Sequence, residues 1–362
     1  LLPFKTKSID FDSLNLAKIQ LKRDGFINIS TDFYAGVVMA IDSAKRLGIS
    51  TKLEVFDTNA QPLDLKTVLL QTNFSNFDAV LGPITTQNLE LTAKYVEKDS
   101  VPVISPFVKT KNIYQNLFQT IPDETWMRTK MVNYVKSDTI PHQTLIIYDA
   151  KNLATANYLK AEFPEATLLA SKKDDEGLEQ FFLMLEDVQA ALLSGRTLVF
   201  LESNNVGFVS NVTSMLNAMN GVTILKDEDD KETEIDRDIF LMTTSKNRAF
   251  EGSNISNYDL SNLHFQYPSV NFDSQFSEAF EQRYVQQFGT FPNKYAIRGF
   301  DITMDILLRL SKNGTLYNES SSFQTAYLEN KFQYFLQPYG GYKNEAGYIL
   351  KYEDLNIVKV QD

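Results

Sequence analysis

Hydroxyl side chains follow two strands that the sequence predicts in the first third of the chain. The first strand, 79–81, leads through a Gly-Pro pair to Thr85 and Thr86, and the second, 101–105, ends at Ser105. The carboxyl ends of parallel strands meet at one edge of a sheet, where open α/β proteins bind ligands. A helix expected after the threonines adds unpaired N–H groups, which attract a carboxylate or phosphate. These residues predict a site for a small anionic or zwitterionic ligand. The alternative is that the threonines cap the helix and the serine only ends its strand.

Residues suited to catalysis or metal binding are scarce. The chain has no cysteine, and neither His142 nor His264 has an acid or a nucleophile beside it in the sequence. General acid–base catalysis needs such a partner within hydrogen-bond reach. Nucleophile-elbow, P-loop, zinc-protease and dinucleotide-binding motifs are also missing. We therefore predict a protein that is not an enzyme and binds no cofactor or metal. A hydrolase that uses some of the 46 acidic residues is a minor alternative.

Composition narrows the class of protein further. A chain of 362 residues suits two domains, and its 26 Phe and 17 Tyr predict a large packed interior. The net charge of −11 argues against a nucleic-acid partner, because phosphate binding needs clustered Lys and Arg. No stretch approaches the roughly 20 apolar residues of a membrane span. The opening Leu1-Leu2-Pro3-Phe4 looks like the end of a strand, so a signal peptide, lipid anchor or further domain upstream is compatible with the sequence.

Alternating strands and helices are expected along most of the chain. Residues 5–30 are polar and weakly patterned, which predicts a long loop. A helix with one buried face is expected from Asp32 to Gly48, followed by a short strand at 53–56. This pattern, built twice, predicts an α/β fold with doubly wound parallel sheets. Further strands are expected at 145–148, 167–169, 198–201, 239–242 and 263–267, and further helices at 65–69, 126–134, 152–162, 176–193, 206–219, 276–289 and 295–310.

Two segments, 226–238 and 347–360, do not follow the alternation of strands and helices. The acidic run 226–238 predicts a solvated loop. Residues 347–360 alternate between apolar and polar side chains around a short turn, which predicts a hairpin.

Five short motifs follow one another along the chain. They are Asp32-Phe33-Tyr34-Ala35-Gly36, Val55-Phe56-Asp57-Thr58, Leu81-Gly82-Pro83, Val101-Pro102-Val103-Ile104-Ser105-Pro106 and Gly299-Phe300-Asp301. In this order and spacing, they resemble the motifs of type I periplasmic binding proteins. The chain is most similar to the branched-chain amino-acid receptor group, and within it to versions in Bacteroidetes-type bacteria that follow peptidoglycan-binding LysM repeats. The resemblance spans nearly the whole chain.

The resemblance implies two Rossmann-like lobes that are joined by three crossovers and close on a ligand in the cleft between them. Mapped onto this chain, lobe I comprises residues 1–120 and 245–330, lobe II comprises 121–244 and 331–362, and the crossovers lie near 119–122, 243–246 and 331.

Candidate ligand contacts follow from the same resemblance. In the family, the loop after the Gly-Pro pair and the turn after Ser105 bind the carboxylate and amino groups of the ligand. We therefore expect Thr85, Thr86, Ser105 and Phe107 to contact the ligand from lobe I. We also expect contacts from Asn204 of lobe II and from Ser245, which lies in the crossover at 243–246.

Lobe II departs from the pattern of the amino-acid receptors. This chain has Leu153 where those receptors place an aromatic side chain, and Ser203 to Asn205 where a second Tyr follows a strand. It has Thr244 or Ser245 where an acidic residue meets the ammonium of the ligand. These departures favour another ligand, or a fold kept for contacts with proteins or the cell wall.

The leading prediction is a solute-binding protein of the periplasm or outer cell envelope, similar to the receptors of ABC transporters. Its expected ligand is a small polar molecule such as an amino acid or related carboxylate, and its expected partner is a membrane permease or a cell-wall-associated protein. The alternative is an interaction module of the cell envelope that has a degenerate ligand cleft.

Overall fold

The computed structural model describes residues 1–226, 232–252, 255–273, 278–317 and 321–360. The chain forms two compact units and passes between them three times. Unit 1 comprises Leu1–Asp123 and Val270–Gly347, and unit 2 comprises Glu124–Ser269 and Tyr348–Asp362. The first boundary lies close to the expected 120, whereas the other two lie beyond the expected 245 and 330. The difference arises because β9 (Gln266–Ser269) pairs within the sheet of unit 2, and β12 (Tyr334–Leu336) and β13 (Tyr342–Asn344) pair within that of unit 1.

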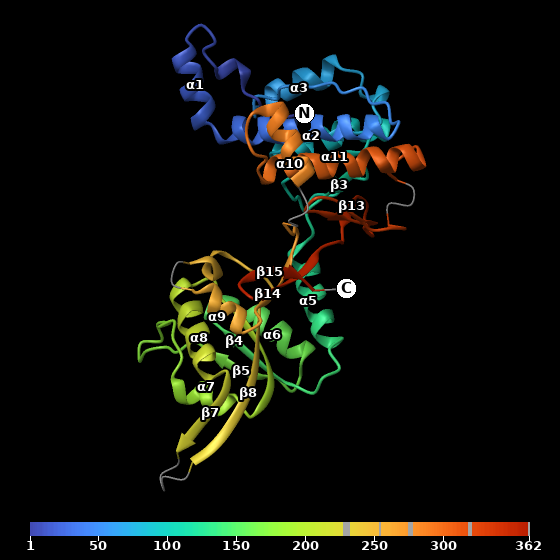
Figure 1. The fold of residues 1–362 in the computed structure, drawn as a ribbon. Helices are drawn as coiled ribbons and strands as arrows, with labels where there is room; N and C mark the ends of the chain where they lie inside the picture. Colours follow the sequence, from blue (N-terminus) through green and yellow to red (C-terminus); the bar gives the residue numbers. More distant parts are fainter. Residues whose placement is uncertain (227–231, 253–254, 274–277, 318–320, 361–362) are drawn as a thin grey trace. The chain divides into compact units, whose positions relative to one another are not determined.

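Unit 1 is built on a sheet of five strands (Figure 1). The first four strands run parallel, and the last is antiparallel to its neighbour. The order is β1 (Val80–Leu81), β2 (Val103–Ser105), β3 (Leu117–Gln119), β13 and β12. A separate short pair joins β10 (Thr325–Ala326) to β11 (Lys331–Phe332).

Helices cover both faces of this sheet. Ile104 and Phe118 point to one face, where they pack with residues of α2 (Gly25–Arg46) and α11 (Lys294–Asn313). Val103 and Leu117 point to the other face, where they pack with α3 (Pro62–Gln71) and α4 (Thr86–Val96). This alternation along each strand makes unit 1 a three-layer α/β unit. The remaining longer helices are α1 (Leu14–Arg23) and α10 (Glu278–Phe288).

The prediction of a loop over residues 5–30 was wrong. The chain forms α1 and then starts α2 at Gly25, seven residues before the expected start. Ser13 caps α1, and Asp24 caps α2 by accepting hydrogen bonds from the backbone N–H groups of Phe26 and Ile27. The expectation failed because α1 has no single apolar face, since most of its apolar side chains are exposed.

The strand expected at 53–56 is also missing from the sheet. Leu53 and Val55 are exposed, and the segment is joined to Leu2 by an isolated bridge at Asp57. The apolar-polar alternation typical of a strand is present there, but in the described part of the chain no strand pairs with residues 53–56.

Unit 2 contains a larger mixed sheet. Five neighbouring strands run parallel, β14 and β15 form an antiparallel extension, and β7 pairs with β8 off the main path. The order is β15 (Asn356–Lys359), β14 (Tyr348–Glu353), β9, β8 (Glu232–Met242), β6 (Gly195–Glu202), β4 (Gln143–Tyr148) and β5 (Thr167–Ala170), with β7 at Gly221–Lys226.

Helices α5 (Glu124–Lys136) and α6 (Leu153–Glu162) pack against one face of this sheet. Figure 1 shows α8 (Val206–Met219) and α9 (Asn257–Asn262) on the other side of its central strands. The helix expected at 206–219 is α8, which has the predicted bounds. The helix expected at 176–193 is shorter, because only Leu185–Ala191 (α7) is helical.

The acidic run was wrongly interpreted as a loop, at least beyond residue 231. Residues 232–238 belong to β8, which pairs with β7, while 227–231 lie outside the described residues. Glu232, Glu234, Asp236 and Asp238 occupy every second position, which is the period of a strand. The hairpin at 347–360 is confirmed as β14 and β15, which turn at Asp354 and Leu355 with φ angles of 48° and 65°.

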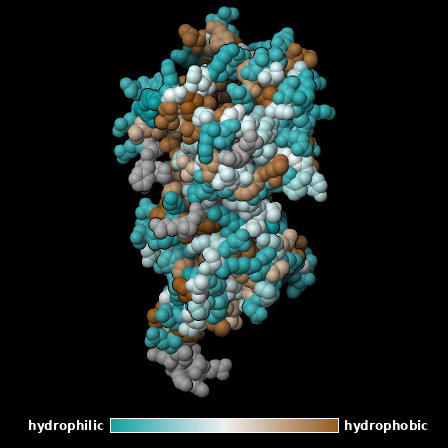
Figure 2. All heavy atoms as spheres, turned by 90° about the vertical axis from the view of Figure 1, so that its right-hand side faces the viewer, coloured by the Kyte–Doolittle hydropathy of each residue, from teal (hydrophilic) through white to brown (hydrophobic). Residues whose placement is uncertain are grey.

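Figure 2 shows hydrophilic side chains over much of the face that it presents, with hydrophobic side chains in scattered groups. Among the helices of the described residues, none combines the length and the apolar composition needed to cross a membrane.

Candidate ligand-binding site

The first candidate edge lies in unit 1, where β1 ends and α4 begins. Thr85 occupies the N-cap position of α4, but its side chain makes no capping hydrogen bond. The Thr85 side chain is half-buried, and that of Thr86 is exposed. The alternative in which these threonines cap the helix is therefore wrong. Their hydroxyl groups lie at the first turn of α4, where the Thr85 side chain accepts no hydrogen bond from the backbone N–H groups. These N–H groups can therefore bind a ligand carboxylate.

Gly82 allows the chain to turn from β1 into this loop. Its φ angle of 83° lies in the left-handed region, and a Cβ atom there would lie 2.4 Å from the carbonyl oxygen of Leu1. Any other residue would be strained and would displace the backbone of Leu1. Glycine is therefore required on steric grounds at the first position of the Gly-Pro motif.

Ser105, at the end of β2, holds the next turn together. Its side chain is buried, and its hydroxyl donates a hydrogen bond to the carbonyl oxygen of Val108. Its own carbonyl oxygen accepts a hydrogen bond of 2.6 Å from the hydroxyl of Thr120, just after β3. In this geometry Ser105 positions the turn, in which Phe107 and Val108 are partly exposed.

Phe107 belongs to an aromatic group at this edge. Its ring packs edge-on against Phe33 of α2 and Tyr295 of α11, with centroid distances of 5.2 and 5.7 Å. Both Phe107 and Tyr295 are partly exposed. They provide an apolar, aromatic surface in the loop that follows the strand next to β1.

Arg298 of α11 was not among the predicted site residues, yet its hydrogen bonds stabilise this edge of the sheet. Its guanidinium group is buried and donates hydrogen bonds to the carbonyl oxygen of Pro106 (2.6 Å), to Asn330 Oδ1 (2.6 Å) and to Thr120 Oγ1 (2.8 Å). Burial lowers the pKa of Arg298 to about 10, so the group stays charged at neutral pH. It therefore links the turns that follow β2 and β3.

Asp301, one helical turn after Arg298, binds the backbone around Asn330. Its carboxylate accepts hydrogen bonds from the backbone N–H groups of residues 328–330 and from the Asn330 side chain, at 2.8–3.0 Å. Burial raises the pKa of Asp301. Asp301 belongs to the Gly299-Phe300-Asp301 motif of the sequence, but the sequence alone does not identify the groups that this carboxylate binds.

The second candidate edge lies in unit 2, at the ends of β4, β6 and β8. Asp149 follows β4 and is buried, and its Oδ2 atom accepts a hydrogen bond of 2.5 Å from the hydroxyl of Ser203, which follows β6. Its Oδ1 atom accepts hydrogen bonds from the backbone and side chain of Asn152. This carboxylate therefore joins two strand ends.

Glu202 joins β6 to β8 in a similar way. The carboxylate is buried and accepts hydrogen bonds from the backbone N–H (2.6 Å) and the hydroxyl (2.9 Å) of Thr244. Burial raises the pKa of Glu202 to about 7, although the hydrogen bonds of Thr244 and the charge of Arg128 lower it. Thr244 is thus bound to a buried acid of the protein itself and is not free to meet a ligand.

Asn204 and Ser245 are the exposed residues of this edge, and Asn247 brings them together. The side-chain amide of Asn247 donates hydrogen bonds to Asn204 Oδ1 (2.7 Å), to the Ser203 carbonyl oxygen (3.0 Å) and to the Ser245 carbonyl oxygen (3.4 Å). Asn247 was missed by sequence reasoning, because nothing in the pattern separates it from other loop asparagines. Leu153, in the position of a receptor aromatic, is also exposed.

Lys246 adds a charged group next to Ser245. Its ammonium nitrogen lies 4.8 Å from the ring centroid of Tyr267 and 5.6 Å from that of Tyr352, and it forms an ion pair of 3.3 Å with Glu251. These contacts hold the lysine against β9 and β14 inside unit 2.

The six predicted site residues therefore fall into two groups. Thr85, Thr86, Ser105 and Phe107 lie at the carboxyl edge of the sheet in unit 1, and Asn204 and Ser245 lie at that of unit 2. Among the described residues, no cluster of three or more His, Asp or Glu side chains could hold a metal ion.

Comparison with known proteins shows similarity of structure and not of sequence. No protein-family model matches the chain, and no curated protein matches its sequence. A structure described as a branched-chain amino acid ABC transporter from Rhodospirillum rubrum has a TM-score of 0.60 and 11% identity, covering 93% of this chain and 96% of the other. The C-domain of LpoA from Haemophilus influenzae, a regulator of PBP1A, has a TM-score of 0.55 and 12% identity, covering 93% and 97%.

A branched-chain amino acid ABC transporter periplasmic ligand-binding protein from Burkholderia xenovorans LB400 matches with a TM-score of 0.52 and 12% identity, over 92% of this chain and 90% of the other. The matches extend over both units. They show that the chain has the fold of type I periplasmic binding proteins, as the sequence motifs indicated.

Proposed function

We propose that this protein is a non-enzymatic, extracytoplasmic solute-binding protein for a small polar ligand that carries a carboxylate. The observation that carries the proposal is the pair of polar strand ends, one in each unit. In unit 1 the hydroxyl groups of Thr85 and Thr86 lie at an uncapped helix end. In unit 2 Asn204 and Ser245 are exposed beside each other. Both sets follow parallel strands, where open α/β units bind ligands.

The chemistry of unit 1 suggests which part of the ligand binds there. The first turn of α4 favours an anionic group, because it combines free N–H donors with the positive end of the helix dipole. Phe107 and Tyr295 offer an aromatic surface in the loop after the neighbouring strand. A carboxylate with an apolar or cationic substituent, as in an amino acid, satisfies both features.

The similar structures support this proposal at the level of fold. Two of them are described as branched-chain amino acid ABC transporter proteins. By analogy, we propose an amino acid or related carboxylate as the ligand, a periplasmic or outer-envelope location, and a membrane permease as a partner.

A second candidate function is an interaction module of the cell envelope with a degenerate ligand site. The specific observation in its favour is Thr244, which stands where a receptor has an acid but is bound to buried Glu202. The similarity to the LpoA C-domain, a regulator of PBP1A, is in keeping with this candidate.

Thermal denaturation in the presence of single amino acids and other small carboxylates would separate the two candidates. A ligand that binds only the folded state raises the midpoint by mass action. We expect at least one compound to raise it, and Thr85→Ala to weaken binding of that compound about tenfold. Thr67→Ala in α3 and Ser137→Ala after α5 are matched controls, because each removes a hydroxyl that only bonds its own helix.

The absence of a shift with every compound would contradict solute binding and favour the interaction module. Unchanged binding in the Thr85→Ala variant would contradict a ligand site at the first turn of α4.

A further inference from the structure

A groove on unit 2 follows one side of α5, beside the end of the β14–β15 hairpin. It has a volume of about 410 Å³, within the range of roughly 300–1,000 Å³ that is typical of ligand pockets. Side chains of α5 line one side of it, and Ile349 of β14 and Val360, just after β15, line the other. The Val360 N–H donates a hydrogen bond of 2.9 Å to the Ile349 carbonyl oxygen, so the two apolar residues are fixed side by side.

The groove residues of α5 form a stripe along the helix. Their spacing of three, four, seven and eight positions places them on one face. They include Trp126, Thr129, Lys130, Asn133 and Tyr134. Tyr134 follows Trp126 by eight positions, which corresponds to about 12 Å along the helix axis. The stripe therefore has an aromatic ring near each end and polar side chains between them.

Polar groups of this stripe are not used within the protein. In the part of the chain that the structure describes, three of them have no hydrogen-bond partner: the indole N–H of Trp126, the side-chain amide of Asn133 and the hydroxyl of Tyr134. Trp126 and Tyr134 are only partly exposed, and Asn133 is exposed. The N–H of Trp and the O–H of Tyr usually find a partner when the ring is buried. These groups therefore suit a ligand that brings hydrogen-bonding atoms into the groove.

Lys130 is the one charged residue in the lining of this groove, all of which the structure describes. Its ammonium nitrogen lies 5.8 Å from the ring centroid of Trp126. A ligand against Trp126 therefore has a cationic donor within reach. A nucleotide fits this lining less well than an uncharged ligand, because its phosphate groups require clustered cations.

We propose that this groove binds a glycan of acetamido sugars, with one sugar ring against Trp126 and another against Tyr134. The inference goes beyond the proposed function and does not depend on it. A pyranose ring has a face of C–H groups, which stacks on an aromatic ring, and a rim of hydroxyl groups, which bind amide, indole and ammonium groups. The distance between the two aromatic residues exceeds the length of one sugar ring, so the ligand is a chain of sugars.

The two sides of the groove indicate the acetamido substituent. Ile349 and Val360 offer apolar surface on one side, and Asn133 on the other side has an amide that both donates and accepts hydrogen bonds. An acetamido group matches both sides, because its methyl group is apolar and its N–H and carbonyl oxygen pair with an amide. A hydroxyl group at the same carbon would leave the apolar side without a partner.

Tryptophan fluorescence tests the proposal directly, because Trp126 is the only tryptophan of the chain. The probes are the N-acetylglucosamine tetramer and the glucose tetramer of the same linkage, which differ in their acetamido groups. We expect the first to shift the emission to shorter wavelength in a saturable way, and to bind at least about fivefold more tightly than the second. The absence of a saturable shift would overturn the proposal, and so would equal or tighter binding of the glucose tetramer.

Two variants test the contacts of the stripe separately. Asn133→Ala should weaken binding of the N-acetylglucosamine tetramer about fivefold, through the loss of hydrogen bonds. Tyr134→Ala should weaken it about tenfold, through the loss of stacking. Tyr134 also packs against the core of unit 2, so its variant is used only if its thermal midpoint shows that it folds. Asn133 is exposed, and its variant keeps the test decisive in either case.

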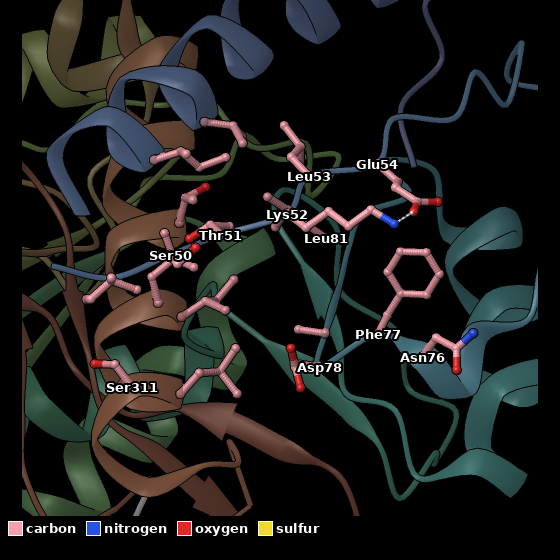
Figure 3. A pocket seen from close by; sticks show the side chains of 18 of the residues that line it. Ser50, Thr51, Lys52, Leu53, Glu54, Asn76, Phe77, Asp78, Leu81 and Ser311 are labelled. Atoms are coloured by element: carbon pink, nitrogen blue, oxygen red, sulfur yellow. Dashed lines mark ion pairs between the residues drawn. The ribbon is translucent and has the colours of Figure 1, made fainter. Parts of the chain in front are cut away.

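A larger groove of about 750 Å³ on unit 1 supplies the matched control. Asn76 and Phe77 line it, and Figure 3 shows the ring of Phe77 facing the ion pair of Lys52 and Glu54. Asn76 is an exposed asparagine next to an aromatic residue, as Asn133 is, but the ring of Phe77 has no polar atom. Asn76→Ala should therefore leave binding of the tetramer unchanged. Unchanged binding in Asn133→Ala, or equal weakening in Asn76→Ala, would overturn the assignment of the glycan to the groove of α5.

Discussion

Gly36 of α2 lies against Ala296 of α11 with no room for a side chain. A Cβ atom at Gly36 would lie 1.9 Å from the carbonyl oxygen of Ala296, and one at Gly299 would lie 2.2 Å from that of Phe33. The two glycines therefore let the helices touch backbone to backbone, on the face of the sheet that contains Phe33 and Ile302. Two of the sequence motifs end or begin at these glycines for this reason.

The substitution Gly36→Ala should destabilise unit 1, because the helices must separate to admit the methyl group. Overpacking of this kind typically lowers the free energy of unfolding by about 1–3 kcal/mol. Gly25→Ala, in the first turn of the same helix, is the control, since a Cβ there meets nothing within 4 Å. Chemical denaturation of both variants would check the prediction, and equal stability of the two would contradict it.

Thr85→Ala should leave stability almost unchanged, although the residue stands at an N-cap. The loss of a true N-cap costs about 1 kcal/mol, but Thr85 makes no capping hydrogen bond. Asn205→Ala is the matched comparison, because Asn205 caps α8 by accepting a hydrogen bond of 2.9 Å from the Phe208 N–H. Denaturation should show a loss below about 0.5 kcal/mol for Thr85→Ala and about 1 kcal/mol for Asn205→Ala. A larger loss in Thr85→Ala would mean that its hydroxyl serves the helix and not a ligand.

Strong hydrophobic periodicity made much of the fold predictable. The helix at 206–219 matches α8, and the final hairpin matches β14 and β15, because their apolar spacing follows the period of the element. Periodicity failed where an element lacks its packing partner. The apolar side chains of α1 are mostly exposed, and the alternation at 53–56 has no neighbouring strand to pair with.

The candidate site could be predicted only in part, for a different reason. Residues that follow strands, such as Thr85 and Asn204, can be located from the positions of the strands themselves. The groups that hold the edges cannot, because their partners are distant in the sequence. Arg298 binds the carbonyl oxygen of Pro106 from 192 positions away, and Ser203 binds Asp149 from 54 positions away. No local pattern encodes such pairs.

Arg298→Met should destabilise the turns that follow β2 and β3. The substitution keeps the length of the side chain but leaves the Pro106 carbonyl oxygen, Asn330 Oδ1 and Thr120 Oγ1 without their guanidinium donor. Leaving a buried acceptor without its donor costs about 1–3 kcal/mol. Arg248→Met on the exposed surface is the control and should change stability by less than about 0.5 kcal/mol. Hydrogen exchange around Phe107 would locate the effect, and an unchanged exchange rate there would contradict the positioning role of Arg298.

Glu202 should make the stability of unit 2 depend on pH in the direction opposite to that of a carboxylate whose pKa is lowered on folding. Burial raises its pKa from 4.5 to about 7, so the folded protein binds the proton more tightly than the unfolded chain does. The resulting stabilisation is complete below about pH 4.5, decreases as pH rises towards 7, and is lost above that value. A shift of this size corresponds to about 3 kcal/mol.

Comparison with Glu202→Gln isolates this effect, because the amide cannot titrate and still accepts the hydrogen bond from the Thr244 N–H through its oxygen. The free energy of unfolding of the wild-type protein minus that of the variant should fall by about 3 kcal/mol between pH 4.5 and pH 8, while contributions from all other groups cancel. Glu186→Gln, on the exposed surface of α7, is the control for replacing a carboxylate by an amide. A constant difference for Glu202→Gln would contradict the prediction, because it would mean that folding leaves the pKa of this carboxylate unchanged.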